Sequence, residues 1–100
     1  MKLHLVACGT RPPDWAAAGF DEFARRIRHP LRLELHEIAL GRRREGEPPD
    51  RAMADEGQRM IKTVPRGARL VALDPKGAAW TTEKLSTHLK SWLAEGRDVL

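Results

Sequence analysis

Two adjoining stretches decide the fold of this chain: Lys2–Cys8 (KLHLVAC) and Gly9–Pro13 (GTRPP). Apart from His4, residues 3–8 are apolar, and the glycine and proline residues that follow end the run. A short apolar run closed in this way is typical of a strand that is buried on both faces. Strands of this kind pair in parallel, so the first thirteen residues predict an α/β sheet.

The next segments alternate between helical and strand periods. From Pro13 to Arg28 the apolar residues recur on one helical stripe, with Pro13 and Asp14 in the first turn. Gly19 lies on this stripe, which predicts a close approach to a neighbouring element. Residues 31–40 alternate apolar and polar side chains and predict a strand near a sheet edge. Residues 50–64 predict a second helix, capped by Asp50, whose apolar stripe is Met53, Gly57, Met60, Ile61 and Val64.

The remainder of the chain repeats the pattern. Arg69–Leu73 predicts a third buried strand, and Thr81 or Thr82 caps a third helix for which Gly96 is the C′ residue. Asp98–Leu100 predicts the start of a fourth strand. The order βαβαβαβ gives the fold class: α/β, a mainly parallel Rossmann-like sheet with helices on its faces. We expect residues 1–100 to form a single domain that is truncated within strand four.

Composition excludes several classes of protein. With 41% hydrophobic and 32% charged residues, the chain is too apolar for a disordered tail. No apolar run approaches the roughly 20 residues that a membrane helix needs, and the run after Met1 is too short for a secretory signal. The single cysteine, Cys8, cannot form an internal disulfide. We therefore expect a cytoplasmic protein with no membrane partner.

Charge and loop positions point to an anionic partner. The net charge is +4, which favours a polyanion such as RNA without establishing one. In a parallel sheet the loops that follow the strands share one edge, where ligands bind. Arg42, Arg43 and Arg44 lie in such a loop, between Gly41 and Gly46, and predict a contact with RNA phosphates. The alternative is a solvated loop without a ligand.

No residue has the spacing of a catalytic or metal site. The histidines at positions 4, 29, 36 and 88 show no metal-ligand spacing, so we expect no metal. We expect His4 and His36 to be sheet residues that are satisfied locally, His29 to lie at a helix C-terminus and His88 to lie on the polar face of a helix. Cys8 is expected to be a small core residue rather than a nucleophile. The common glycine-rich phosphate loops are absent. The sequence therefore predicts no catalytic residue in this chain.

An ordered set of residues along the whole chain resembles the ribosomal large-subunit methyltransferase H family, in the SPOUT superfamily of knotted methyltransferases. The residues that carry the resemblance are Gly9-Thr10, Pro13, Trp15, Gly19, Phe20, Glu22, Arg25-Arg26, Glu37-Ile38, Gly41-Arg42-Arg43, Glu56-Gly57, Leu73-Asp74, Gly77, Trp80 and Gly96-Arg97-Asp98-Val99. Each motif is weak alone, but together they run the full length of the chain. Phe23 and Ala39 depart from the family, which usually has tyrosine and often proline there.

The resemblance implies an activity and a cofactor. The family methylates N3 of a pseudouridine in 23S rRNA, uses S-adenosylmethionine, acts on the assembled 70S ribosome and forms homodimers. Its trefoil knot follows the segment that ends this chain, so this fragment alone is expected to be inactive. The family's cofactor-contacting leucine matches Leu73, which also ends the predicted third strand at the ligand edge. The alternatives are that Leu73 is a core residue, and that the chain is a non-catalytic basic module that binds RNA or ribosomes.

Overall fold

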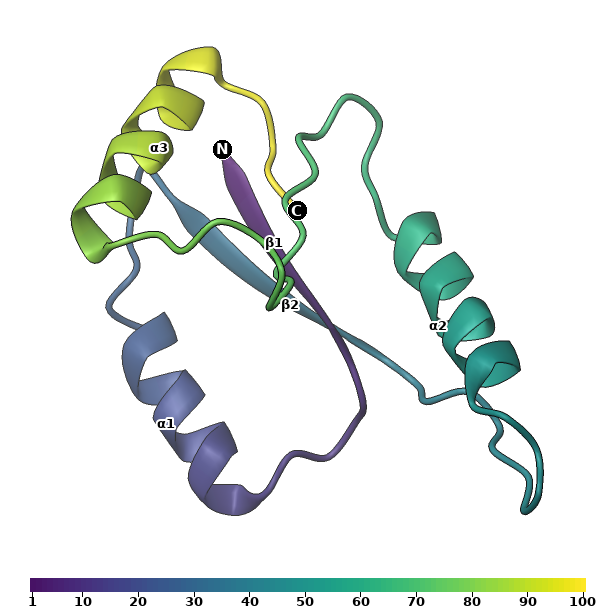
Figure 1. The fold of residues 1–100 in the computed structure, drawn as a ribbon. Helices are drawn as coiled ribbons and strands as arrows, with labels where there is room; N and C mark the ends of the chain where they lie inside the picture. The colour runs from purple at the N-terminus through teal and green to yellow at the C-terminus, as the bar shows by residue number, and fades with distance from the viewer.

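The computed structural model describes residues 1–100 as two strands and three helices (Figure 1). In chain order the elements are β1 (Lys2–Cys8), α1 (Asp14–Ala24), β2 (Arg32–Ile38), α2 (Asp50–Lys62) and α3 (Thr82–Glu95). Helices α1 and α3 lie on one side of the strand pair and α2 lies on the other (Figure 1). The predicted α/β class with parallel strands is confirmed. None of the helices has the length and apolar character that crossing a membrane requires.

The sheet is parallel and has β2 at its edge, as the alternating pattern predicted. Strands β1 and β2 pair from Lys2 opposite Arg32 to Cys8 opposite Ile38. The parallel pattern continues through isolated bridges that join Leu3 to Val99 and Val99 to Arg69. The spatial order is therefore β2, β1, residues 98–100 and residues 69–71.

The predicted third strand is shorter than the sequence indicated. Its pairing consists of hydrogen bonds with residues 98–100, in which the N–H groups of Arg69 and Val71 donate to Asp98 and Leu100. These bonds have lengths of 2.8 Å, and none forms beyond Val71. Residues 72 and 73 lack a strand neighbour, so the strand predicted over 69–73 is reduced to a bridge.

The ends of α3 follow the predicted signals. The Oγ1 atom of Thr81 accepts a hydrogen bond from the Lys84 N–H at 3.1 Å, which identifies Thr81 as the N-cap. Gly96 ends the helix with a φ of 72°, the left-handed conformation that glycine adopts at low cost. Helix α1 begins directly after Pro13 but ends at Ala24, whereas the predicted helical stripe extends to Arg28.

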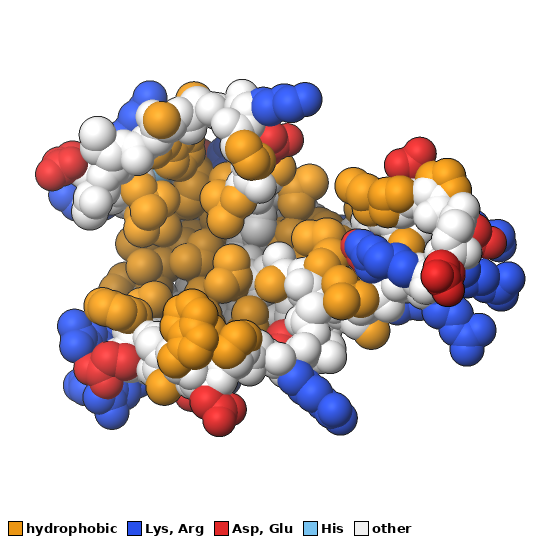
Figure 2. Space-filling model, turned by 60° about the horizontal axis from the view of Figure 1, so that its bottom comes forward, with side chains coloured by type: hydrophobic (Ala, Val, Ile, Leu, Met, Phe, Trp, Pro, Cys, Tyr) orange, Lys and Arg blue, Asp and Glu red, His pale blue; other side chains and the backbone are white.

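The buried core is small, and it differs from the predicted apolar stripes. Only Ile38, Ala52, Trp92 and Val99 are buried apolar residues. The predicted stripes of α1 and α2 are largely exposed, and the exposed members are Trp15, Phe23, Met53 and Ile61. Figure 2 shows apolar side chains gathered over a broad part of one face, with basic side chains toward the rim. A stripe pattern predicts which side chains share a face, but it does not predict that the face is covered.

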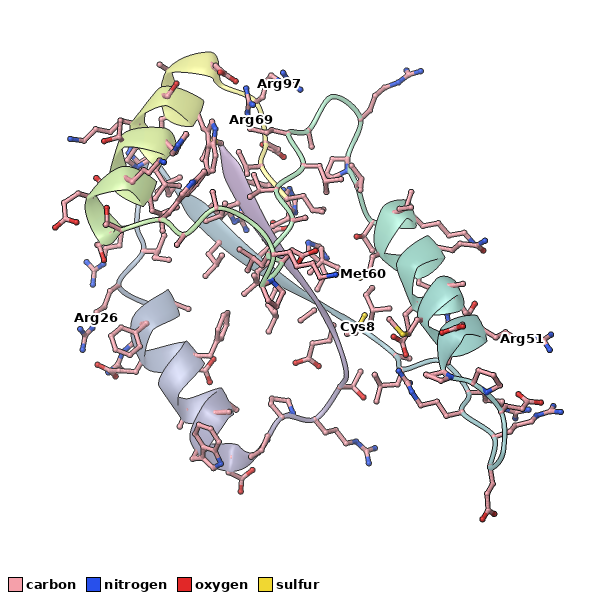
Figure 3. The ribbon with its side chains drawn as sticks, viewed as in Figure 1. Cys8, Arg26, Arg51, Met60, Arg69 and Arg97 are labelled. Carbon is pink, nitrogen blue, oxygen red and sulfur yellow. The ribbon has the colours of Figure 1, made fainter.

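Two single-residue expectations were wrong. A Cβ atom built on Gly19 would meet no atom within 4 Å, so this glycine does not mark a close approach. Cys8 is exposed rather than part of the core, and its Sγ lies 3.4 Å from the Sδ of Met60 on α2 (Figure 3). This contact places α2 on the face of the sheet that carries the side chains of Lys2, His4, Val6 and Cys8.

Candidate functional site

The loops that follow the strands gather at the carboxyl edge of the sheet. The backbone N–H of Gly9 donates to the carbonyl of Ile38 at 2.7 Å, which ties the ends of β1 and β2 together. The loop from Gly41 to Gly46 continues from β2, and the turn Asp74–Gly77 follows the segment that pairs with residues 98–100. Ligands of parallel α/β sheets bind at this edge.

A buried carboxylate anchors the arginine loop to α2. The Oε1 atom of Glu56 accepts hydrogen bonds from the Gly41 N–H at 2.9 Å and from Nη1 of Arg43 at 2.7 Å. The Glu56 side chain is only 10% exposed. The Arg43 hydrogen bond, helped by the one from Gly41, holds the pKa of Glu56 below its usual value. Glu56 therefore stays ionised and fixes the start of the loop.

The three arginines of the loop have different environments. Arg43 is committed to Glu56 and to the carbonyl of Gly41, so its guanidinium faces the protein. The side chains of Arg42 and Arg44 form no ion pair or hydrogen bond in the structure. Together with Arg51 of α2 they line a shallow hollow of about 280 Å³. The predicted RNA site therefore divides into one anchoring arginine and two unpaired ones.

The hollow carries a net positive charge. Its other lining residues are Glu47, Ala52 and Asp55, and the carboxylate of Asp55 is paired with Arg59 at 2.9 Å. Figure 3 shows the Arg51 side chain extending from α2 into solvent. Arg51 is not among the RNA-binding residues predicted from the sequence. The sequence shows only that Arg51 follows Asp50 in the first turn of the predicted helix. It does not show which loop lies beside that turn.

Leu73 lies at the same edge and is 88% exposed. It is therefore not a core residue in this structure. Its backbone N–H and C=O make no hydrogen bond within the chain, whereas the adjoining turn is held by bonds from Lys76 N–H to the Asp74 side chain and from Gly77 N–H to the Asp74 carbonyl. An apolar side chain beside free backbone donor and acceptor groups suits a nucleoside-type ligand. Leu73 thus offers one apolar surface and two unpaired backbone groups to the S-adenosylmethionine that the resemblance implies.

A cluster of histidines and a carboxylate was also missed. Spacing along the sequence predicted no metal site, yet His4, Glu34 and His36 come together on one face of the sheet. The signal that would have found them is the register of the two strands, because parallel pairing puts His4 directly opposite Glu34. That register is not readable from spacing within either strand.

Comparison with known proteins gives one consistent family. A profile described as "Predicted SPOUT methyltransferase" matches residues 1–100. A "Ribosomal RNA large subunit methyltransferase H" of Paraburkholderia phymatum is 48% identical over 99 residues, and so is one of Paraburkholderia xenovorans. A protein of the same name from Burkholderia mallei is 46% identical. Each match covers 99% of this chain and 64% of the relative, so the chain spans 64% of the length of these relatives.

Proposed function

Because the chain belongs to the SPOUT methyltransferase family, we propose that the protein methylates ribosomal RNA with S-adenosylmethionine as the methyl donor. The proposed target atom is N3 of a pseudouridine in 23S rRNA. The proposed setting is the assembled 70S ribosome in the cytoplasm, with the enzyme acting as a homodimer.

One observation carries this proposal: the similarity runs over 99 residues, at 46–48% identity, to proteins that share one name. The arrangement of the carboxyl edge supports it. An exposed leucine with free backbone groups and a hollow with unpaired arginines lie on loops of the same edge. A methyl donor and a phosphate backbone are the two ligands that such an enzyme must hold.

This chain would contribute by binding the cofactor and by positioning it relative to the RNA. S-adenosylmethionine, when bound, supplies an activated methyl group on a sulfonium. Leu73 would cover an apolar part of that cofactor, while its backbone N–H and C=O satisfy polar atoms of the nucleoside. Holding donor and acceptor in line removes much of the entropic cost of methyl transfer. We predict that no residue of this chain acts as the base that removes the N3 proton.

The RNA would be held by charge. Arg42, Arg44 and Arg51 form no ion pair with the protein, so their guanidinium groups are free to contact phosphates. Phosphate contacts orient the substrate and supply affinity that is independent of base sequence. Base recognition would have to come from other groups.

The function is tested by methyl transfer to ribosomes. The full-length protein is incubated with isotopically labelled S-adenosylmethionine and with 70S ribosomes from a strain that lacks the modification. The rRNA is then digested to nucleosides, which are identified by mass spectrometry. We expect label in N3-methylpseudouridine of 23S rRNA and in no other nucleoside. Ribosome binding without any methyl transfer would favour the non-catalytic RNA-binding module instead.

Leu73→Ala is expected to weaken S-adenosylmethionine binding by the full-length protein about tenfold, because a buried leucine contributes on the order of 1.5–3 kcal/mol. The free energy of unfolding should change by less than about 0.5 kcal/mol, since the side chain is exposed. Calorimetry and urea unfolding measure the two effects. Leu70→Ala, three residues earlier and also exposed, serves as the control. Equal cofactor affinity in both variants would remove Leu73 from the cofactor site.

Replacing both Arg42 and Arg44 with alanine is expected to flatten the salt dependence of ribosome binding. The slope of log K against log salt should fall by about 0.7–0.9 for each phosphate that is no longer neutralised. The unfolding midpoint should not change, because neither side chain is paired. Arg28→Ala combined with Arg66→Ala removes the same charge at exposed positions outside the hollow. If this control flattens the slope equally, the effect is one of net charge and the hollow is not a docking site.

A further inference from the structure

Three ligand-type side chains converge on the face of the sheet that α2 shares. His4 comes from β1, whereas Glu34 and His36 come from β2. The parallel register places His4 opposite Glu34, and His36 follows two residues later, so all three side chains point to the same face. Two regular strands therefore hold the cluster, and no loop contributes to it.

The three facing atoms are close enough to share one ion. His4 Nδ1 lies 3.0 Å from His36 Nε2, and Glu34 Oε2 lies 3.7 Å from the first and 3.8 Å from the second. Three points at these separations lie on a circle with a radius of about 2 Å, which matches the ordinary distances from zinc to nitrogen and oxygen. A hydrogen bond between the two imidazole rings accounts for the contact between His4 and His36 but not for the two contacts with Glu34.

We propose that His4, Glu34 and His36 bind a divalent transition-metal ion of the zinc class. Two imidazoles and one carboxylate form a donor set that suits Zn²⁺ and leaves a fourth position for water. Ca²⁺ and Mg²⁺ are disfavoured because they require mostly oxygen ligands.

The surroundings of Glu34 and His4 prepare both side chains for this role. Lys2 Nζ contacts Oε1 of Glu34 at 3.2 Å, which leaves Oε2 directed at the histidines. His4 is buried at 7% exposure, and its other nitrogen, Nε2, lies 3.1 Å from Oδ2 of Asp98.

Metal-bound histidines normally form a hydrogen bond through the ring nitrogen that does not bind the metal, and Asp98 is in the position to accept that bond from His4. It is itself held, because its Oδ1 accepts a hydrogen bond from the backbone N–H of Lys2 at 3.0 Å. This contact fixes the ring of His4 with Nδ1 facing Glu34 and His36. The ion would join β1, β2 and the segment at Asp98, away from the carboxyl edge, so we assign it a structural role separate from methyl transfer.

Metal binding is tested on the full chain after removal of any affinity tag and of metal by chelation. Titration with Zn²⁺ by calorimetry, and with Co²⁺ by visible absorption, should show one equivalent bound. His36→Gln and Glu34→Gln should abolish this binding, and Asp98→Asn should weaken it about 10–100-fold. His29→Gln, which removes an exposed histidine outside the cluster, should bind like the wild type.

Folding and binding are separated by a second readout. His36 and Glu34 are each about one third exposed, so their glutamine variants are expected to fold, and circular dichroism checks this. Zn²⁺ should raise the unfolding temperature of the wild type and of His29→Gln but not that of His36→Gln. Absence of binding by the wild type, or equal binding by all variants, would overturn the proposal and leave the cluster as a hydrogen-bonded network.

Discussion

Trp92→Ala is expected to lower the free energy of unfolding by about 3–5 kcal/mol, the usual cost of removing a buried tryptophan. Trp92 is 7% exposed and is the only buried residue of α3. Its ring lies 6.3 Å from that of Trp80 and 5.7 Å from that of His88, and those two rings stack at 4.0 Å. Alanine would leave a cavity beneath this stack in a molecule with few other buried apolar side chains.

The matched control is Trp15→Ala. Trp15 is 80% exposed on α1, so the same chemical change should alter stability by no more than about 0.5 kcal/mol. Urea unfolding of the full-length protein followed by far-ultraviolet circular dichroism measures both variants without relying on tryptophan emission. If the two variants lose equal stability, Trp92 does not anchor α3 as the structure indicates.

The elements that the sequence predicted well are those with local signals. The apolar run that ends at Cys8 predicted β1, and the threonine and glycine at the ends of α3 predicted its boundaries. Each signal acts within a few residues, through a cap, a turn or a change of period. Tertiary packing was not needed to interpret them.

The predictions that failed depend on distant partners. The buried face of α2 carries Ala52 and Glu56 instead of the predicted apolar stripe. A glutamate is typical of a solvent-facing position, and its burial here depends on hydrogen bonds from Gly41 and Arg43, fifteen and thirteen residues earlier. In the same way, the His4 and His36 contact is set by strand register across 32 residues. Spacing within one element contains no information about either pair.

Glycines illustrate the same limit. Gly19 lies on an apolar stripe and suggested close packing, but the space beside it is open. Gly41 lies in a polar loop and gave no such signal, yet its backbone touches α2. The difference depends on where α2 lies, and α2 begins nine residues later at Asp50.

Gly41→Ala is accordingly expected to destabilise the protein by about 1–3 kcal/mol or more, the range for forcing extra atoms into a packed site. A Cβ atom at this position would lie 2.6 Å from the carbonyl oxygen of Ala52 and 2.9 Å from its Cα. These are backbone atoms in the first turn of a helix, so they cannot move aside as a flexible side chain would. The loop must shift instead.

A shift of the loop should also affect RNA binding. The Gly41 N–H and Arg43 share one oxygen of Glu56, so moving Gly41 disturbs the anchor that positions Arg42 and Arg44. We expect Gly41→Ala to reduce the salt dependence of ribosome binding as well as the unfolding midpoint. Gly57→Ala is the matched control, because its Cβ would meet nothing within 4 Å, and alanine inside a helix should stabilise by about 0.5–1 kcal/mol. If Gly41→Ala is as stable as Gly57→Ala, the loop does not pack on α2. If it loses stability but keeps the full salt slope, the loop packs as described but does not contact RNA.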